Sequence, residues 1–170
     1  MTATPSAATA EHAFPPANLP AFLQCCAGEW MSLRSRFDLE AEGADDEWHA
    51  SERGELVVEA LPAAGATGLG GLAAMPKEGG QRQELHFHAD GQFRREPAAD
   101  CGAASGHWTL WPDGSLDLVI DQGDRQLRER IWFTKPNLRL RSTVEQFNNG
   151  SPGRASFSSE IRRVSRPAAS

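Results

Sequence analysis

Short apolar segments separated by turn-forming residues recur along this 170-residue chain, and they limit the fold more than any other feature. The clearest example is GHWTLWPDGSLDLVID, residues 106–121, in which apolar residues alternate with others on both sides of Pro-Asp-Gly. Alternation with a period of two is typical of a strand with one buried face, and Pro-Asp-Gly favours a tight turn. We therefore expect a β-hairpin here, with a buried face made of Trp108, Leu110, Leu116, Leu118 and Ile120.

The same pattern recurs with little helical periodicity between the segments. One short helix is expected over 20–28, because Pro20 suits a first helical turn and Gly28 suits a helix end. Residues 62–80 are rich in glycine and alanine and are expected to form a loop. Short strands without βαβ alternation predict an all-β fold, a meandering antiparallel barrel or sandwich. Besides the hairpin, the expected strands lie at 30–40, 55–61, 81–96 (two strands), 125–133, 137–147 and 154–164.

The composition narrows the class of protein. Seventeen Lys and Arg residues against 23 Asp and Glu give a formal net charge of −6, which argues against a general nucleic-acid binder. Cys25, Cys26 and Cys101 form no CxxC pair, so we expect neither a zinc knuckle nor a disulfide framework, and a reducing compartment is favoured. The N-terminal residues lack the features of a secretory signal, and no apolar run is long enough to span a membrane. A cytoplasmic protein is expected.

The two ends of the chain differ in composition from the rest. Both are rich in alanine, proline and serine, and such segments bury too little apolar surface to fold. We expect disordered tails at 1–19 and 165–170, and one barrel domain over 20–164.

The segment RERIWFTKPNLRLRS, residues 128–142, poses the main question of orientation. Before its turn, the apolar face of the strand also carries Glu129, which places this carboxylate inside. After the turn, Arg139 and Arg141 share one face and leucines take the other. Hydrophobicity alone turns the arginines toward solvent, whereas an interior Glu129 needs a cationic partner that inward arginines would supply. Inward arginines would leave apolar faces outside, to be covered by the helix or a second subunit.

The sequence ERIWFTKPNLRLRS followed by ASFSSEIRR resembles the S-type phycobiliprotein lyases, the CpcS/CpeS family. The family pattern is E-R-[LI]-W-F, then P-N-L-R-[LM]-R-[TS], then A-S-F-C-S-E-I-R near the C-terminus. AGEWMSLRS and the hairpin at 106–121 are similar to two further segments of that family. The resemblance is strong over 105–164, fair over 22–36 and poor over 41–100.

This resemblance implies a lipocalin-like antiparallel up-and-down β-barrel of about 8–10 strands with a short N-terminal helix. It implies a bilin lyase that binds phycocyanobilin or phycoerythrobilin without a covalent bond. The lyase would attach the bilin by a thioether bond to a cysteine of an apo-phycobiliprotein subunit. No cofactor is implied, because the bilin is the substrate and the nucleophile is the partner's thiol. A light-harvesting role in the cyanobacterial cytosol or plastid stroma follows.

The resemblance also assigns roles to five charged residues. Arg34, Arg139 and Arg141 are the substrate-binding candidates, because a planar guanidinium matches a propionate carboxylate. Glu129 and Glu160 are the catalytic candidates, which would accept bonds from pyrrole N–H groups and move a proton during addition.

The chain departs from the family pattern at several positions. Leu33 replaces a glutamine, Ser158 replaces a cysteine, and a histidine pair after Arg34 is absent. These departures motivate an alternative function, a non-catalytic bilin- or fatty-acid-binding carrier or the non-catalytic partner in a heterodimeric lyase. A homodimer or a heterodimer with a related subunit is expected.

Two further features have a structural and a functional interpretation. Gly28-x-Trp30 resembles the lipocalin signature, in which the tryptophan closes one barrel end and stacks on an arginine. Arg139, Arg141 or Arg162 could be that stacking partner instead of a ligand contact. A second feature is His86 and His88, which share a strand face but have no evident third metal ligand in the sequence, so no metal site is predicted.

Overall fold

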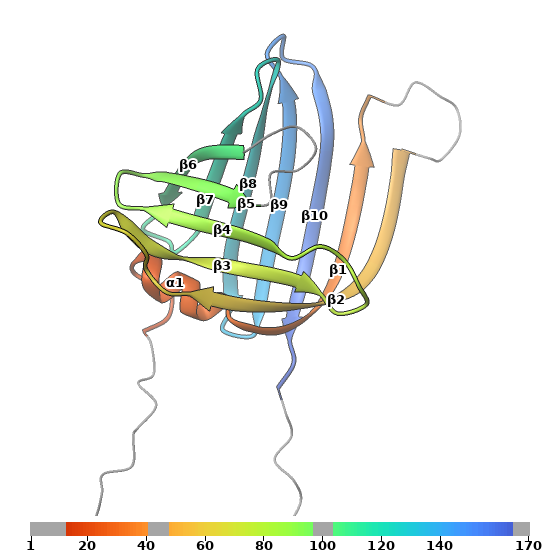
Figure 1. Cartoon of the computed structure of the whole chain (residues 1–170). Helices are drawn as coiled ribbons and strands as arrows, with labels where there is room; N and C mark the ends of the chain where they lie inside the picture. The colour runs from red at the N-terminus through yellow and green to blue at the C-terminus, as the bar shows by residue number, and fades with distance from the viewer. Residues whose placement is uncertain (1–12, 41–47, 97–103, 165–170) are drawn as a thin grey trace, which may run out of the picture.

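The computed structural model describes residues 13–40, 48–96 and 104–164, which form a closed barrel with one short helix. Each strand pairs antiparallel with its neighbours in sequence, and β1 pairs with β10 to close the barrel (Figure 1). This confirms the predicted all-β up-and-down barrel, and ten strands lie within the predicted number. The strands are β1 (Gly28–Asp38), β2 (His49–Leu61), β3 (Gly68–Pro76), β4 (Gln83–His88), β5 (Gln92–Glu96), β6 (Ala104–Leu110), β7 (Leu116–Asp121), β8 (Arg125–Lys135), β9 (Leu138–Phe147) and β10 (Pro152–Arg162).

Alternation along the strands builds the core as expected. Leu116, Leu118 and Ile120 of the predicted hairpin are buried, and Trp108 packs against them. The inward-facing rings of Phe87 and Phe93 lie opposite each other across the β4–β5 turn. Burial of these side chains supplies the main favourable term in folding.

The helix α1 (Leu19–Cys26) closes one end of the barrel (Figure 1). Asn18 caps it by accepting a hydrogen bond from the backbone N–H of Ala21, and Pro20 lies in the first turn. Phe22 is fully buried, with its ring edge toward Phe133 at 5.5 Å between centroids. The helix therefore seals the barrel end from which β1 begins.

The loop predicted over 62–80 is wrong, because the nine-residue β3 lies in the middle of it. The glycines of β3 let its backbone lie close to neighbouring elements. In the sequence, the same glycines indicated a loop. A Cβ at Gly71 would overlap the carbonyl oxygen of Leu85 on β4, and Gly70 has a φ of +120° at a bulge against Leu23 of the helix. β2 is also longer than predicted, since it begins at His49.

The predicted tails lie largely outside the described residues, which exclude 1–12 and 165–170. Of the residues that lead into the helix, Phe14 lies edge-on to the Phe133 ring. Within the described part of the chain, no helix is long and apolar enough to cross a membrane.

Candidate functional site

Inward side chains of β8, β9, β10 and β1 form a charged stack inside the barrel. Arg139 lies opposite Glu160 across β9 and β10, and Arg141 lies opposite Ser158 one step further from the helix. Arg139 is 4% exposed and Glu160 is completely buried. The arginines of the PNLRLR segment therefore point inward, although hydrophobicity alone predicted the opposite.

The layer next to the helix is built around Trp30. The guanidinium carbons of Arg139 and Arg162 lie 4.7 and 4.3 Å from the centre of the Trp30 ring, which is cation–π geometry. Arg162 also donates hydrogen bonds to the carbonyl oxygens of Cys25 and Ala27 at the helix end. Arg139 and Arg162 are thus the stacking partners of Trp30, and Arg141 is not.

The next layer is a network of ion pairs. Arg139 Nε donates to Glu160 Oε2 at 2.5 Å, and Arg141 Nη2 donates to Glu160 Oε1 at 2.9 Å. Glu129 receives two longer contacts of 3.5 Å, from Arg141 Nη1 and Arg95 Nη2. The side chains of Glu129 and Arg141 are 12% and 28% exposed. The buried pair of Arg139 and Glu160 therefore supports the pair of Arg141 and Glu129, which solvent and ligands can reach.

The neighbours of Arg139 keep this buried guanidinium charged. Burial acts to lower the pKa of Arg139, but the negative charges that Cys26 and Glu160 can carry outweigh it and raise the pKa. Both oxygens of Glu160 accept hydrogen bonds from guanidinium groups. A buried ion pair is tolerated when its polar atoms are satisfied in this way.

Arg34 differs from the other interior arginines in having an unused donor. Its Nη2 donates to Ser156 Oγ at 3.2 Å, whereas its buried Nε has no hydrogen-bond partner among the described residues. In the described residues, no carboxylate lies within ion-pair distance of it. Burial lowers the pKa of Arg34, and the charge of Arg141 lowers it further. Such a group gains from an incoming anion.

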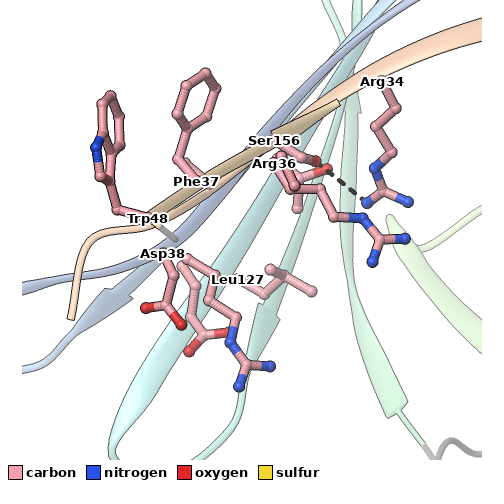
Figure 2. A pocket seen from close by; sticks show the side chains of 12 residues that line it. Arg34, Arg36, Phe37, Asp38, Trp48, Leu127 and Ser156 are labelled. Atoms are coloured by element: carbon pink, nitrogen blue, oxygen red, sulfur yellow. Dashed lines mark hydrogen bonds between the residues drawn. The ribbon is translucent and has the colours of Figure 1, made fainter. Parts of the chain in front are cut away.

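A cavity of about 480 Å³ opens beside Arg34 (Figure 2). It lies toward the strand ends remote from the helix. Arg34 and Arg36 point into the space, and Ser156 lies beside Arg34. Leu127 and Thr143 line it two residues before Glu129 and two after Arg141 on their strands. Its volume lies in the range of about 300–1,000 Å³ for small-molecule sites. The remaining lining residues are Phe37, Asp38, Trp48, Ala50, Glu145, Arg154 and Ala155.

The five predicted site residues lie in one stack but at different depths. Arg34 lines the cavity and shares a row of the strand ladders with Ser158 and Arg141, and Glu129 lies opposite the cavity-lining Thr143. Arg139 and Glu160 lie one step closer to the helix, against Trp30. The assigned catalytic and binding roles remain predictions, and the positions favour Arg34, Arg141 and Glu129 for direct contact.

Sequence reasoning missed two arginines near the site. Arg95 reaches Glu129 from β5 across the barrel, and Arg36 lines the cavity. The alternation of Phe93 and Arg95 in QFRRE puts both on one face, and Phe93 is buried. This alternation could have predicted from the sequence that Arg95 points into the barrel.

Cys25 and Cys26 lie apart from the cavity. Cys26 is buried under the helix and Cys25 is partly buried, and both are free thiols. Burial raises the pKa of each thiol, which makes them poor nucleophiles. Cys101 lies outside the described residues.

Comparison with known proteins adds to this description. Residues 83–163 match the family model described as CpeS-like protein. A chromophore lyase CpcS/CpeS 1 of Paulinella chromatophora is 40% identical over 154 residues, which are 90% of this chain and 92% of that protein. A chromophore lyase CpcS/CpeS 1 of Synechocystis sp. strain PCC 6803 is 26% identical over 169 residues, with 84% and 89% of the two chains covered.

The fold also has a counterpart among solved structures. The S-type phycobiliprotein lyase CpeS from Guillardia theta superposes with a TM-score of 0.62 at 20% identity. The match covers 85% of this chain and 92% of that one. This likeness supports the barrel architecture.

Proposed function

Because the chain belongs to the CpcS/CpeS chromophore lyase family, we propose that it is a bilin lyase. It binds a phycobilin such as phycocyanobilin or phycoerythrobilin without a covalent bond. It then attaches the bilin through a thioether to a cysteine of an apo-phycobiliprotein subunit.

The unpaired positive charge beside the cavity is the observation that carries this proposal. In the interior network, Arg34, Arg95, Arg139 and Arg141 give four guanidiniums against the two carboxylates of Glu129 and Glu160, a formal excess of two positive charges. The cavity lining adds Arg36 and Arg154 against Asp38 and Glu145, which leaves this excess unchanged. A bilin carries two propionates, which would neutralise that excess. Arg34 supplies a free donor and Arg141 a partly exposed one. We propose that these two arginines bind the propionates.

Glu129 is the proposed acid–base group. Its carboxylate is 12% exposed and held by long contacts of 3.5 Å, so a pyrrole N–H can compete for it. During addition, the partner's sulfur forms a bond to the ethylidene carbon of the bilin. The thiol proton is transferred to the conjugated system, and Glu129 relays it. Glu160 and Arg139 support Arg141 from below.

No resident cofactor is needed for this reaction, since addition of a thiol to an electrophilic bilin is redox-neutral. The proposed partners are the bilin, the apo-subunit and a second copy of the chain or a related subunit. The outer face of β1, β9 and β10 motivates the last of these, because it leaves Met31, Leu33, Phe157 and Ile161 more than 40% exposed. The proposed location is the cyanobacterial cytosol or plastid stroma.

Co-expression with a bilin pathway and candidate apo-subunits tests the proposal. We expect fluorescent holo-subunit in higher yield than without the protein, and a shifted bilin absorption band when the purified protein is mixed with the pigment. Loss of the pigment on denaturation would show that the protein itself holds it without a covalent bond. Pigment binding without a gain in holo-subunit would instead favour the carrier function.

A further inference from the structure

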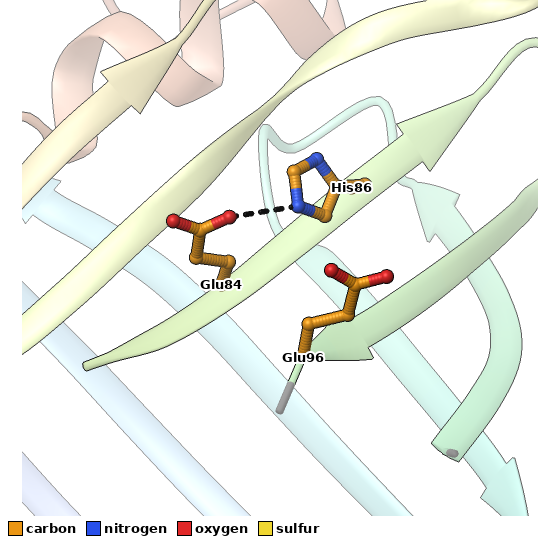
Figure 3. Close-up of side chains that lie close together, drawn as sticks. All are labelled: Glu84, His86 and Glu96. Atoms are coloured by element: carbon orange, nitrogen blue, oxygen red, sulfur yellow. Dashed lines mark hydrogen bonds and ion pairs between the residues drawn. The ribbon is translucent and has the colours of Figure 1, made fainter. Parts of the chain in front are cut away.

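Three metal-ligand side chains meet on the outer surface of the barrel, away from the interior cavity. Glu84 and His86 lie two apart on β4, and Glu96 ends β5 (Figure 3). One donor atom from each lies within 4.8 Å of the other two. His86 lacked an evident third ligand in the sequence because Glu96 joins it only through the pairing of β4 with β5.

The pairing of these strands places two negative charges directly opposite each other. Glu84 and Glu96 are Cα partners in the β4–β5 ladder. Like charges at opposed positions are destabilising. A cation between them would turn that repulsion into a bridge.

Each of the two carboxylates has one oxygen paired with an arginine. Arg82 Nε donates to Glu84 Oε1 at 2.9 Å, and Arg94 Nη2 lies 3.3 Å from Glu96 Oε1. The second oxygen of Glu84 lies 3.0 Å from His86 Nε2. Outer partners of this kind orient carboxylate ligands in metal sites.

A hollow of about 220 Å³ lies beside two of the three donors, His86 and Glu96, and gives an independent indication of a ligand. His86 and Glu96 line it, and the other lining residues are Pro62, Ala64, Gly68, Gly70, Phe87, His88 and Arg94. The hollow leaves room for a water molecule to complete the coordination of a bound cation.

We propose that Glu84, His86 and Glu96 bind a divalent transition-metal cation, with Zn²⁺ as the representative ion. One imidazole nitrogen and two carboxylate oxygens suit Zn²⁺ better than Mg²⁺, which prefers oxygen ligands alone. The ion would join β4 and β5, which have six and five residues and are shorter than the eleven-residue β1, β8 and β10. The role is structural and does not depend on the proposed lyase reaction.

Zn²⁺ titration of the full-length protein by calorimetry tests the site. The wild type is compared with His86→Ala, with Glu96→Gln and with the control His88→Ala. His88 lies on the same strand and face and also lines the hollow, but its Nδ1 contacts Thr67 and it is not one of the three donors. We expect His86→Ala to weaken binding more than about tenfold, since loss of an outer partner alone costs about 10–100-fold. We expect Glu96→Gln to weaken it as well, and His88→Ala to change it less than twofold.

The melting temperature provides a second measurement that needs neither bilin nor apo-subunit. Zn²⁺ should raise it in the wild type and in His88→Ala but not in His86→Ala, because a ligand of the native state stabilises that state. Circular dichroism would verify that each variant is folded. Equal Zn²⁺ binding by the wild type and His86→Ala would overturn the proposal, and so would binding of Mg²⁺ as strong as that of Zn²⁺.

Discussion

Arg139 and Glu160 form a buried ion pair, with 2.5 Å between Nε and Oε2, next to the more accessible pair of Arg141 and Glu129. Arg139 also lies over Trp30, which the helix seals from solvent. The pair therefore joins the closed end of the barrel to the proposed binding site. Its contribution to stability and its contribution to function can be tested separately.

Glu160→Gln should lower the free energy of unfolding by about 3 kcal/mol, because it leaves the buried charge of Arg139 without a counter-charge. Urea denaturation would measure this. The control is Glu52→Gln, which breaks the exposed pair with Arg36 and should cost less than about 1 kcal/mol. Equal effects of the two substitutions would contradict the assignment of Glu160 as a buried structural carboxylate.

Arg34→Gln and Arg141→Gln should each weaken bilin binding at least about tenfold, since each removes one charge-assisted bond to a propionate worth about 1.5–3 kcal/mol. Absorbance titration with phycocyanobilin would give the dissociation constants. Arg128→Gln is the matched control, because Arg128 is an exposed residue on β8. Unchanged affinity in the double variant would show that the propionates bind elsewhere.

Arg162→Met should destabilise the barrel by about 2 kcal/mol, because it removes the cation over Trp30 and the donors to the carbonyl oxygens at the helix end. In Arg162→Met, amide hydrogen exchange should become faster in the helix, with a smaller change in the strands. Arg163→Met is the control, since Arg163 makes an exposed pair with Glu55. Similar exchange in both variants would refute a role for Arg162 in holding the helix.

The strands and turns were largely predictable because alternation and turn residues report local structure. The hairpin around Pro-Asp-Gly and the pairing of 125–133 with 137–147 follow from neighbouring residues. β3 was not predictable, because its glycines serve contacts with Leu85 and Leu23 that only the closed barrel creates.

The site was predictable only in part, for a related reason. The inward direction of Arg139 contradicts hydrophobicity and is explained by Glu160 and Trp30, which lie far away in the sequence. The interior position of Glu129 was the one indication in the neighbouring sequence that these arginines point inward. The depth of each residue depends on the barrel register, so the sequence placed Glu160 and Glu129 on equal terms although one is sealed and the other is reachable.

Alkaline pH should reveal the burial of Cys26. Burial raises the pKa of its thiol above the ordinary value of 9.0, against the opposing charge of Arg139. A raised native-state pKa gives stability that is complete below the unfolded pKa and is lost as the pH rises through the native one. Cys26→Ala should have a lower free energy of unfolding than the wild type at pH 7.5. The difference between the two proteins should become smaller toward pH 10.5.

Urea midpoints at several pH values would measure the narrowing for Cys26→Ala. The nearby ionisable groups Cys25, Glu160, Arg139 and Arg162 are present in both proteins. The chain contains no tyrosine that would titrate in this range. A gap that stays constant from pH 7.5 to 10.5 would contradict the raised pKa.

The outer face of β1, β9 and β10 should mediate self-association. The helix packs at the barrel end and leaves this face open, with Phe157 43% and Ile161 52% exposed. Phe157→Glu and Ile161→Glu should each shift the protein from dimer to monomer, because a charge cannot be buried there without a partner. Light scattering after size-exclusion chromatography would measure the mass.

Trp111→Glu is the control for this last prediction, since Trp111 is 47% exposed in the turn between β6 and β7, away from the β1–β10–β9 face. It should leave the mass unchanged. A wild-type protein that is monomeric at all concentrations would refute self-association through this face. The exposed apolar residues would then be available for the apo-subunit, and Phe157→Glu should lower the yield of holo-subunit without weakening bilin binding.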